Sequence, residues 1–199
     1  CAEKRDKILG SVNNNVGIVT VNQSAGNMNN QGSAVAVAVD VANGPPGDDG
    51  SDGRKKGGFA ESQAAVDQKN GAFKRIDSVD GQSGGNRVDS INILFREALI
   101  DGSVNNNAGI VLVNQSPGNM NNQANAVSVA VSLFGGVAMA EADLGQVNAG
   151  NYVNEFNVTK TATISGSVNH NAGIVGVNQS AGNMANQANV VSVAAAIGR

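Results

Sequence analysis

Amide side chains recur three times in this chain with an unchanged spacing. Asparagine and glutamine each carry a donor and an acceptor, so identical amides placed about 4.8 Å apart can hydrogen-bond in a continuous column. A strand that slips in register would leave buried amides unpaired, at about 1–3 kcal/mol each. The recurring positions are Asn13, Asn15, Asn22, Gln23, Asn27, Asn30 and Gln31; Asn105, Asn107, Asn114, Gln115, Asn119, Asn122 and Gln123; and Asn169, Asn171, Asn178, Gln179, Asn183, Asn186 and Gln187. We expect them to form ladders through which the chain assembles with itself, the alternative being surface polar residues and turn formers.

Other residues with chemical potential are few. His170 stands at a position that is Asn in the other two copies, so we interpret it as a substitution in the ladder and not as a catalytic residue. Cys1, the only cysteine, is a candidate for lipidation, with a free thiol or an interchain bridge as alternatives. The acidic run 48–53 is a poor calcium loop, because Gly50 lacks the required side-chain oxygen. We therefore expect no catalytic residue, no cofactor and no metal site.

The amides belong to a block of 30 residues that occurs at 10–39, 102–131 and 166–195. Adjacent copies are identical at 24 of 30 positions, and no copy contains a charged residue. If the copies stack, a charge would face its own kind in every layer, whereas stacked amides bond to one another. The absence of charge therefore indicates that the copies stack on themselves.

Within each block the pattern predicts two strands around a turn. In the second copy Val111 and Val113 fall on one face of a strand, and Leu112 and Asn114 fall on the other. The second arm, 126–131, alternates small and β-branched residues, as in a strand. The motif Ser-x-Gly-Asn separates the arms, and we expect its glycine and asparagine to accommodate positive φ. The turn glycines are Gly26, Gly118 and Gly182.

The remaining segments carry all the charge of the chain. They are an N-terminal charged arm (1–9), a first linker (40–101), a second linker (132–165) and a C-terminal tail (196–199). Turn-forming residues at 43–53 predict a loop, and 87–100 predicts a strand or a short helix. Alternation over 152–164 predicts another strand, so both apolar segments are candidates to extend the stack, with the charged linkers outside it.

The composition excludes several classes of protein. Aromatic residues make up 3% of the 199 residues and tryptophan is absent, so a large globular core is not expected. The net charge is −3, and no basic cluster is interleaved with aromatic residues, which argues against a nucleic-acid partner. No apolar stretch approaches the ~20 residues of a transmembrane helix.

These patterns predict an all-β chain, a cross-β or β-solenoid fold with three arch-like rungs per subunit. One layer of about 30 residues buries too little area to offset its conformational entropy, so the layers must stack. Monomeric solenoids end in atypical polar repeats, but here the first and last copies are nearly as regular as the middle one. The third rung of one molecule is then a template for the first rung of the next, and growth is open-ended.

The block resembles the repeats of bacterial functional amyloid subunits of the Fap type, and its architecture is curli-like. The motif G-I-V-x-V-N-Q-S-x-G-N-M-x-N-Q, the three copies and the unequal linkers carry this resemblance, over about 90 of the 199 residues. It implies a secreted protein that forms cross-β fibres outside the cell and scaffolds biofilm or adhesion. It also implies other copies of the chain, a secretion pore and a nucleator subunit as partners.

Three alternatives remain open at this point. A monomeric β-solenoid adhesin or binding protein would need capping repeats. A pilus-like fibre would be joined by strand donation, with the arm 1–9 completing the next subunit. An enzyme on a parallel β-helix would need acidic residues clustered on neighbouring rungs, and the blocks contain none.

Overall fold

The computed structural model describes residues 2–41, 58–71, 86–91, 93–133 and 136–197, and in these segments the chain forms thirteen strands and no helix. This confirms the all-β prediction. The predictions for Cys1 and for the loop at 43–53, including the acidic run, lie outside the described residues. The strands are β1 (Ala2–Leu9), β2 (Val16–Ser24), β3 (Asn30–Asp40), β4 (Phe59–Gly71), β5 (Arg87–Ile91), β6 (Ile93–Asp101), β7 (Ala108–Ser116), β8 (Asn122–Leu133), β9 (Val137–Ala149), β10 (Tyr152–Phe156), β11 (Thr159–Ser165), β12 (Ala172–Gln179) and β13 (Asn186–Ile197).

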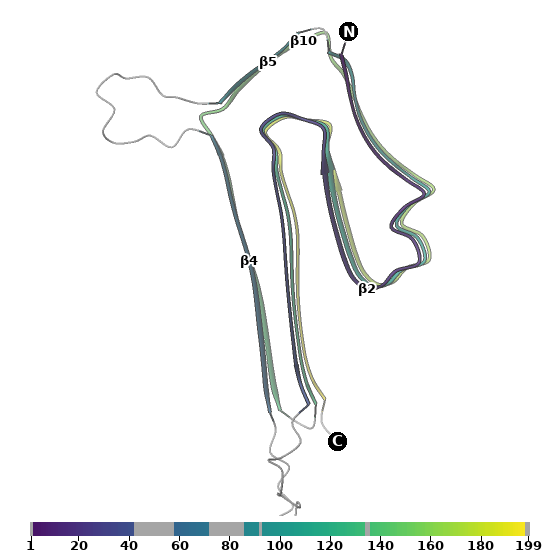
Figure 1. Ribbon diagram of the computed structural model, residues 1–199, viewed down its shortest axis with the longest axis vertical. Helices are drawn as coiled ribbons and strands as arrows, with labels where there is room; N and C mark the ends of the chain where they lie inside the picture. The colour runs from purple at the N-terminus through teal and green to yellow at the C-terminus, as the bar shows by residue number, and fades with distance from the viewer. Residues whose placement is uncertain (1, 42–57, 72–85, 92, 134–135, 198–199) are drawn as a thin grey trace, which may run out of the picture. The chain divides into compact units, whose positions relative to one another are not determined.

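Strands that are far apart in the sequence pair because they occupy equivalent places in the three copies. The three-stranded sheets have the orders β1-β6-β11, β2-β7-β12 and β3-β8-β13, and β4-β9 and β10-β5 form pairs. In β2-β7-β12 the pairing is parallel, and Ile18, Ile110 and Ile174 lie at the same register position. We call β1–β3 the first row, β6–β8 the second row and β11–β13 the third row. In Figure 1 the purple, teal and yellow traces of the three rows run beside one another.

The described chain divides into two compact units. Unit 1 comprises 1–33, 67–125 and 145–189, and unit 2 comprises 34–66, 126–144 and 190–199. Unit 1 contains the recurring amides, the turns and both parallel three-stranded sheets β1-β6-β11 and β2-β7-β12. The candidate site therefore belongs to unit 1.

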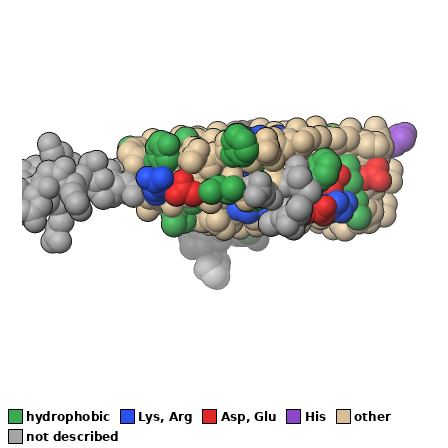
Figure 2. All heavy atoms as spheres, turned by 90° about the horizontal axis from the view of Figure 1, so that it is seen from above, with side chains coloured by type: hydrophobic (Ala, Val, Ile, Leu, Met, Phe, Trp, Pro, Cys, Tyr) green, Lys and Arg blue, Asp and Glu red, His purple; other side chains and the backbone are tan. Residues whose placement is uncertain are grey.

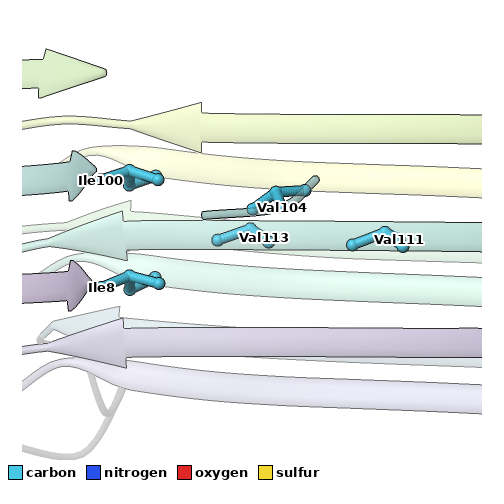
Figure 3. Close-up of a cluster of buried hydrophobic side chains, with 5 residues drawn as sticks. All are labelled: Ile8, Ile100, Val104, Val111 and Val113. Atoms are coloured by element: carbon cyan, nitrogen blue, oxygen red, sulfur yellow. The ribbon is translucent and has the colours of Figure 1, made fainter. Parts of the chain in front are cut away.

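The core of unit 1 is thin and aliphatic. Ile8 and Ile100 pack with Val104, Val111 and Val113, all of which are buried (Figure 3). Val111 and Val113 thus share the face that meets β1 and β6, as the alternation of β7 predicts. Because this cluster joins the sheets β1-β6-β11 and β2-β7-β12, the stack is two sheets thick at this point.

The stack extends beyond the 30-residue blocks. The segments directly before the blocks form β1, β6 and β11, which pair in parallel with Lys4, Arg96 and Lys160 at one register position. The segments at 87–101 and 152–165 form β5, β6, β10 and β11, with a break at Asn157 and Val158 between the last two, and their described residues form no helix. The expectation that charged residues stay outside the stack is therefore wrong. These strands can stack because neighbouring groups compensate the charges of their cations.

A strained corner precedes the first arm of each block. Val12, Val104 and Val168 have φ of 58°, 58° and 61°, in the left-handed region that is unfavourable for a β-branched residue. The N–H of Val104 donates to the carbonyl of Ser11, and that of Val168 donates to the carbonyl of Ser103, each over 3.0 Å. The corner is thus held by bonds between rows.

Unit 2 is built from small residues. Ala60 and Ala64 of β4 and Ala126 and Ala130 of β8 are buried. The Ser128 hydroxyl donates to the carbonyl of Ser62 over 2.7 Å. Part of the first linker is therefore packed and not displayed on the outside, since the short side chains of β4 permit close approach of the strands.

Candidate self-assembly site

Five of the seven predicted amide positions form direct side-chain ladders across the three rows. In the Asn114 column, Nδ2 of Asn114 donates to Oδ1 of Asn22 over 3.0 Å, and Nδ2 of Asn178 donates to Oδ1 of Asn114 over 3.1 Å. The other four columns have Nδ2–Oδ1 or Nε2–Oε1 distances of 2.8–3.2 Å. These columns are Asn15, Asn107 and Asn171; Gln23, Gln115 and Gln179; Asn30, Asn122 and Asn186; and Gln31, Gln123 and Gln187.

The other two predicted positions bond to backbone across the rows. Oδ1 of Asn13 accepts the N–H of Asn105, and Oδ1 of Asn105 accepts that of Asn169, both over 2.7 Å. In the turn, Oδ1 of Asn119 accepts the N–H of Asn27 over 3.0 Å, and Oδ1 of Asn183 accepts that of Asn119 over 2.9 Å. All 21 predicted residues thus take part in bonds between rows, Asn27 and Asn169 through their backbone N–H groups and the others through their side chains.

The ladders have a direction. In the Asn22 and Gln23 columns each side chain donates toward the first row. In the columns that begin at Asn15, Asn30 and Gln31, each side chain donates toward the third row. The outer faces of the first and third rows therefore differ in the donors and acceptors they present.

Sequence reasoning missed a second amide that interlocks with the Asn114 column. Asn125 and Asn189 come from the second arms, and Nδ2 of Asn189 donates to Oδ1 of both Asn114 and Asn125 over 3.0 Å. The first copy has Ser33 at this position, so a search for amides present in all three copies passes over it. The identical spacing to the preceding glutamine in the second and third copies was the available signal.

A third amide position, Asn29 and Asn121, was missed for the same reason, since the third copy has Ala185. Oδ1 of Asn29 accepts the N–H of Asn121, and Oδ1 of Asn121 accepts the N–H of Ala185, both over 2.7 Å. In the turn of the second row two asparagine oxygens therefore accept backbone N–H groups of neighbouring rows, and in the first and third rows one does so.

The turn glycines are needed for a different reason from the one predicted. None of Gly26, Gly118 and Gly182 has a positive φ, and the left-handed residues of the turn are the methionines, at φ 53–55°. A Cβ on Gly26 would overlap the carbonyl oxygen of Gly118, and a Cβ on Gly118 would overlap that of Gly182. Glycine is thus required because the backbones of adjacent rows touch there. The left-handed methionines are Met28, Met120 and Met184.

A charged cluster lies against the turn. The Arg96 guanidinium is fully buried and pairs with Glu155, whose other oxygen lies 2.5 Å from Nζ of Lys160. Burial lowers the pKa of Arg96, although the charge of Glu155 opposes this. Burial also raises the pKa of Glu155, but hydrogen bonds from Lys160 and Asn183 and the charge of Arg96 outweigh it, so this pKa is lowered. Glu155 therefore stays ionised as the shared counter-ion of two rows.

The first row carries its own buried charges. Oδ2 of Asp6 accepts the N–H of Ala25 over 2.9 Å, and burial raises the pKa of this carboxyl to about 6, against the opposing effect of that bond. Nζ of Lys4 donates to Oδ1 of Asn119 over 2.8 Å, and burial followed by the charge of Arg96 lowers the pKa of Lys4. Acidic and basic side chains are therefore part of the stacked structure.

Little else in unit 1 suggests chemistry. His170 is exposed (Figure 2, purple). Within the described segments no three His, Cys, Asp or Glu side chains are placed to hold a metal ion. The same segments include no helix of the length and hydropathy needed to cross a bilayer. The amide columns are thus the repeated chemical feature of the site.

Comparison with known proteins places the sequence of this chain in a family. The model of the functional amyloid protein FapB/FapC family matches residues 2–196, nearly the whole chain. The chain belongs to the FapB/FapC family. Against the functional amyloid subunit FapC of Pseudomonas aeruginosa it is 35% identical over 121 residues, or 59% of this chain. The matched part is 35% of that relative's length, and no solved structure matches the chain.

Membership of the FapB/FapC family makes this chain a functional amyloid fibre protein, since the family is one of structural subunits and not of enzymes. The prediction of a Fap-type functional amyloid is thereby confirmed. The family match also includes β1, β6 and β11, which lie outside the 30-residue blocks.

Proposed function

We propose that this chain is secreted and assembles head to tail into an extracellular amyloid-like filament that serves as a biofilm scaffold or adhesion fibre. Its main partner is a second copy of itself, with a secretion pore and a nucleator subunit as further partners. The three rows then form rungs of an open-ended cross-β or β-solenoid stack. The name of the matched relative, a functional amyloid subunit, supports this proposal.

The observation that carries the proposal is the complementarity of the two outer rows. The columns of Asn22 and Gln23 donate toward the first row, so a further row placed beyond β2 would have to offer acceptors. The third row offers them as the side-chain oxygens of Asn178 and Gln179. The columns that begin at Asn15, Asn30 and Gln31 run in the opposite direction, so there the third row offers donors and the first row offers acceptors. The third row of one molecule therefore complements the first row of the next.

Backbone contact supports the same joint. The glycine of each of the first two rows touches the backbone of the row after it, whereas a Cβ on Gly182 of the third row would meet only Oγ of Ser180, at 3.4 Å. Within the described segments β2 and β12 are the outer strands of their sheet, and no described strand pairs with their outer edges. Such edges promote strand addition.

Two rival functions receive less support. A monomeric solenoid adhesin needs a cap on each end, and the described segments place none on the β2 or β12 edge. Strand donation by the N-terminal arm needs an unpaired arm, but β1 pairs along its length with β6 of its own chain. Row-on-row stacking therefore accounts better for the arrangement than either alternative.

The experiment that tests this function is electron microscopy of the purified full chain combined with fibre diffraction. Filaments with a meridional spacing near 4.7–4.8 Å are expected, because each row adds one strand spacing along the axis. A chain that stays a discrete monomer at all concentrations would contradict the proposal.

The joint itself is tested with Gly182→Ala. The added methyl group has space in the single chain, but by analogy with Gly26 and Gly118 it would overlap the Gly26 carbonyl of the next subunit. We expect a folded chain that does not elongate and that shortens wild-type filaments when mixed in at low ratio. Ala181→Ser, one residue away, is the control, because the second copy tolerates Pro117 at this position. Filaments of normal length from Gly182→Ala would exclude this stacking geometry.

A further inference from the structure

Three cations occupy one register position, and the first two reach into the next row. Nζ of Lys4 donates to Oδ1 of Asn119 over 2.8 Å. Nη1 of Arg96, the register partner of Lys4, donates in the same way to Oδ1 of Asn183. Each cation therefore bonds to the turn asparagine of the row that follows its own.

The same two asparagine oxygens also accept a backbone N–H from the preceding row. Oδ1 of Asn119 accepts from Asn27 over 3.0 Å, and Oδ1 of Asn183 accepts from Asn119 over 2.9 Å. A repeated unit results, in which one cation and one backbone amide of a row hold one asparagine of the next row. Bonds with an ionised donor are stronger than neutral ones, so the cation supplies much of the attraction.

In the first and third rows only one half of this repeated unit is present. Lys160 continues the cation column in the third row, and its side chain is 36% exposed and pairs with Glu155. Asn27 begins the asparagine column in the first row and is exposed. Within the described segments, no donor to Oδ1 of Asn27 is found. The third row thus ends in a donor, Lys160, that has no following row, and the first row begins with an acceptor, Oδ1 of Asn27, that has no preceding row.

We propose that Lys160 of one subunit donates to Oδ1 of Asn27 in the next subunit, while the N–H of Asn183 donates to the same oxygen. This inference rests on the proposed head-to-tail assembly and assigns a specific cation to its joint. Arg96 shows that one cation can make both kinds of contact at once, because it pairs with Glu155 of β10 and donates to Asn183 of the third row. Lys160 retains free N–H donors beside Glu155.

The pair also selects the correct joint among alternatives. If two third rows met, Lys160 would face another Lys160, and like charges would repel. If a subunit slipped by one row, Lys160 would approach Asn119, whose Oδ1 already accepts from Lys4 and Asn27. Only the joint between a third row and a first row offers the lysine an unused acceptor.

The test uses the full chain and compares Lys160→Met, Asn27→Ala and the double variant. The measured quantities are the concentration of soluble chain in equilibrium with filaments and the rate of elongation from wild-type seeds. We expect each single variant to raise the soluble concentration about tenfold, a size typical of a charge-assisted hydrogen bond. The double variant is expected to be no worse than either single variant, because both remove the same contact.

Two further variants serve as controls. Lys160→Arg should assemble like the wild type, since Arg96 fills the same register position in the second row. Lys69→Met removes an equally charged, exposed side chain that pairs with Asp67 over 3.1 Å, and it should also assemble normally.

The outcomes separate this inference from the function on which it rests. Wild-type filaments together with an unchanged soluble concentration for Lys160→Met would overturn the inference and leave head-to-tail assembly intact. Multiplying effects in the double variant, near a hundredfold, would also overturn it, because the two residues would then act independently. A wild-type chain that never polymerises would overturn the proposed function and this inference with it.

Discussion

Nδ2 of Asn125 lies 2.9 Å from Oδ1 of Asn22, which belongs to the preceding row. The bond ties the second arm of one row to the first arm of another, and Asn189 repeats it toward Asn114. The first copy has Ser33 at this position, and its hydroxyl accepts from Nδ2 of Asn22 within the same row. In the proposed head-to-tail assembly, the joint between subunits would therefore lack a cross-tie that both internal junctions possess.

Restoring this cross-tie should strengthen assembly. In Ser33→Asn, the new amide would reach Oδ1 of Asn178 in the preceding subunit, as Asn125 and Asn189 do within the chain. We expect the soluble concentration at equilibrium to fall about fivefold, corresponding to one net hydrogen bond of about 1 kcal/mol. Sedimentation of filaments followed by assay of the supernatant measures this. Ser33→Ala should change little, and weaker assembly of Ser33→Asn would contradict the cross-tie.

A charge inside a ladder should prevent stacking. Asn114 is fully buried and bonds to Asn22, Asn125 and the carbonyl of Ala124. Asn114→Lys would bury an unpaired ammonium group, so we expect seeded elongation to slow at least about tenfold. Time-resolved light scattering with electron microscopy of the products gives the rate.

The control for this substitution is Gln63→Lys. Gln63 is an exposed amide whose Nε2 donates to Oε2 of Glu141 over 3.3 Å, so a lysine there keeps an acidic partner. Its filaments should form at the wild-type rate. If Asn114→Lys elongated equally fast, an interior amide column would be ruled out.

Removing the shared counter-ion should destabilise the folded chain more than removing a surface acid. Glu155→Gln leaves the fully buried Arg96 without its ionic partner, which costs about 3–5 kcal/mol in comparable buried pairs. Glu97→Gln removes only the exposed pairs with Arg5 and Lys7 and should cost less than about 1 kcal/mol. Urea unfolding of freshly desalted chain, before filaments form, gives both values. Equal losses for the two variants would contradict the role of Glu155.

Stability should fall as the pH rises toward neutrality, because of Asp6. Its pKa is about 6 in the folded chain and 3.8 ordinarily, so between these values the folded chain binds more protons than the unfolded chain. The stabilisation is complete below pH 3.8 and lost through pH 6, with an expected size on the order of 1–2 kcal/mol after solvent screening. The lowered pKa of Glu155 acts oppositely, and only below its ordinary value of 4.5. Urea unfolding between pH 4.5 and 7 measures the Asp6 effect.

Asp6→Asn should remove this dependence. The amide oxygen can still accept the N–H of Ala25, so the variant keeps the hydrogen bond and loses the titration. Its stability should be nearly constant from pH 4.5 to 7. An unchanged slope in this variant would assign the dependence to another group.

The strands of the blocks and the 21 amide positions were predictable because identical residues recur at a fixed spacing in the three copies. When the copies pair in register, these identical residues lie next to one another. The cross-tie of Asn125 was not found, because one serine interrupts its recurrence. The segments of β6 and β11 were candidates to extend the stack, but the pairing of β1 with them was not predicted, because the three sequences differ. They share only a basic residue, an Ile four positions later and a Gly two positions after that, just beyond the strand. These triplets are Lys4, Ile8 and Gly10; Arg96, Ile100 and Gly102; and Lys160, Ile164 and Gly166.

Two other features of the structure depend on distances between residues of adjacent rows, which the recurrence of residues in the sequence does not reveal. The requirement for Gly118 comes from the carbonyl of Gly182 in the adjacent row and not from its own φ. Similarly, a column of Lys4, Arg96 and Lys160 is acceptable only because Glu155, Asn119 and Asn183 surround it. The argument from like charges was made for the 30-residue blocks, and nothing in the sequence indicates that these three cations share a register position.

The left-handed valines at the corner have a kinetic consequence. Each costs about 1–2 kcal/mol in an isolated layer, and the corner recovers this only through bonds such as that from Val104 to Ser11. An unfolded segment therefore resists adopting the corner by itself and takes it up readily against a row that is already formed. For the proposed filament we therefore expect slow spontaneous initiation and fast addition to existing ends, so that filament mass accumulates after a lag that a preformed seed abolishes.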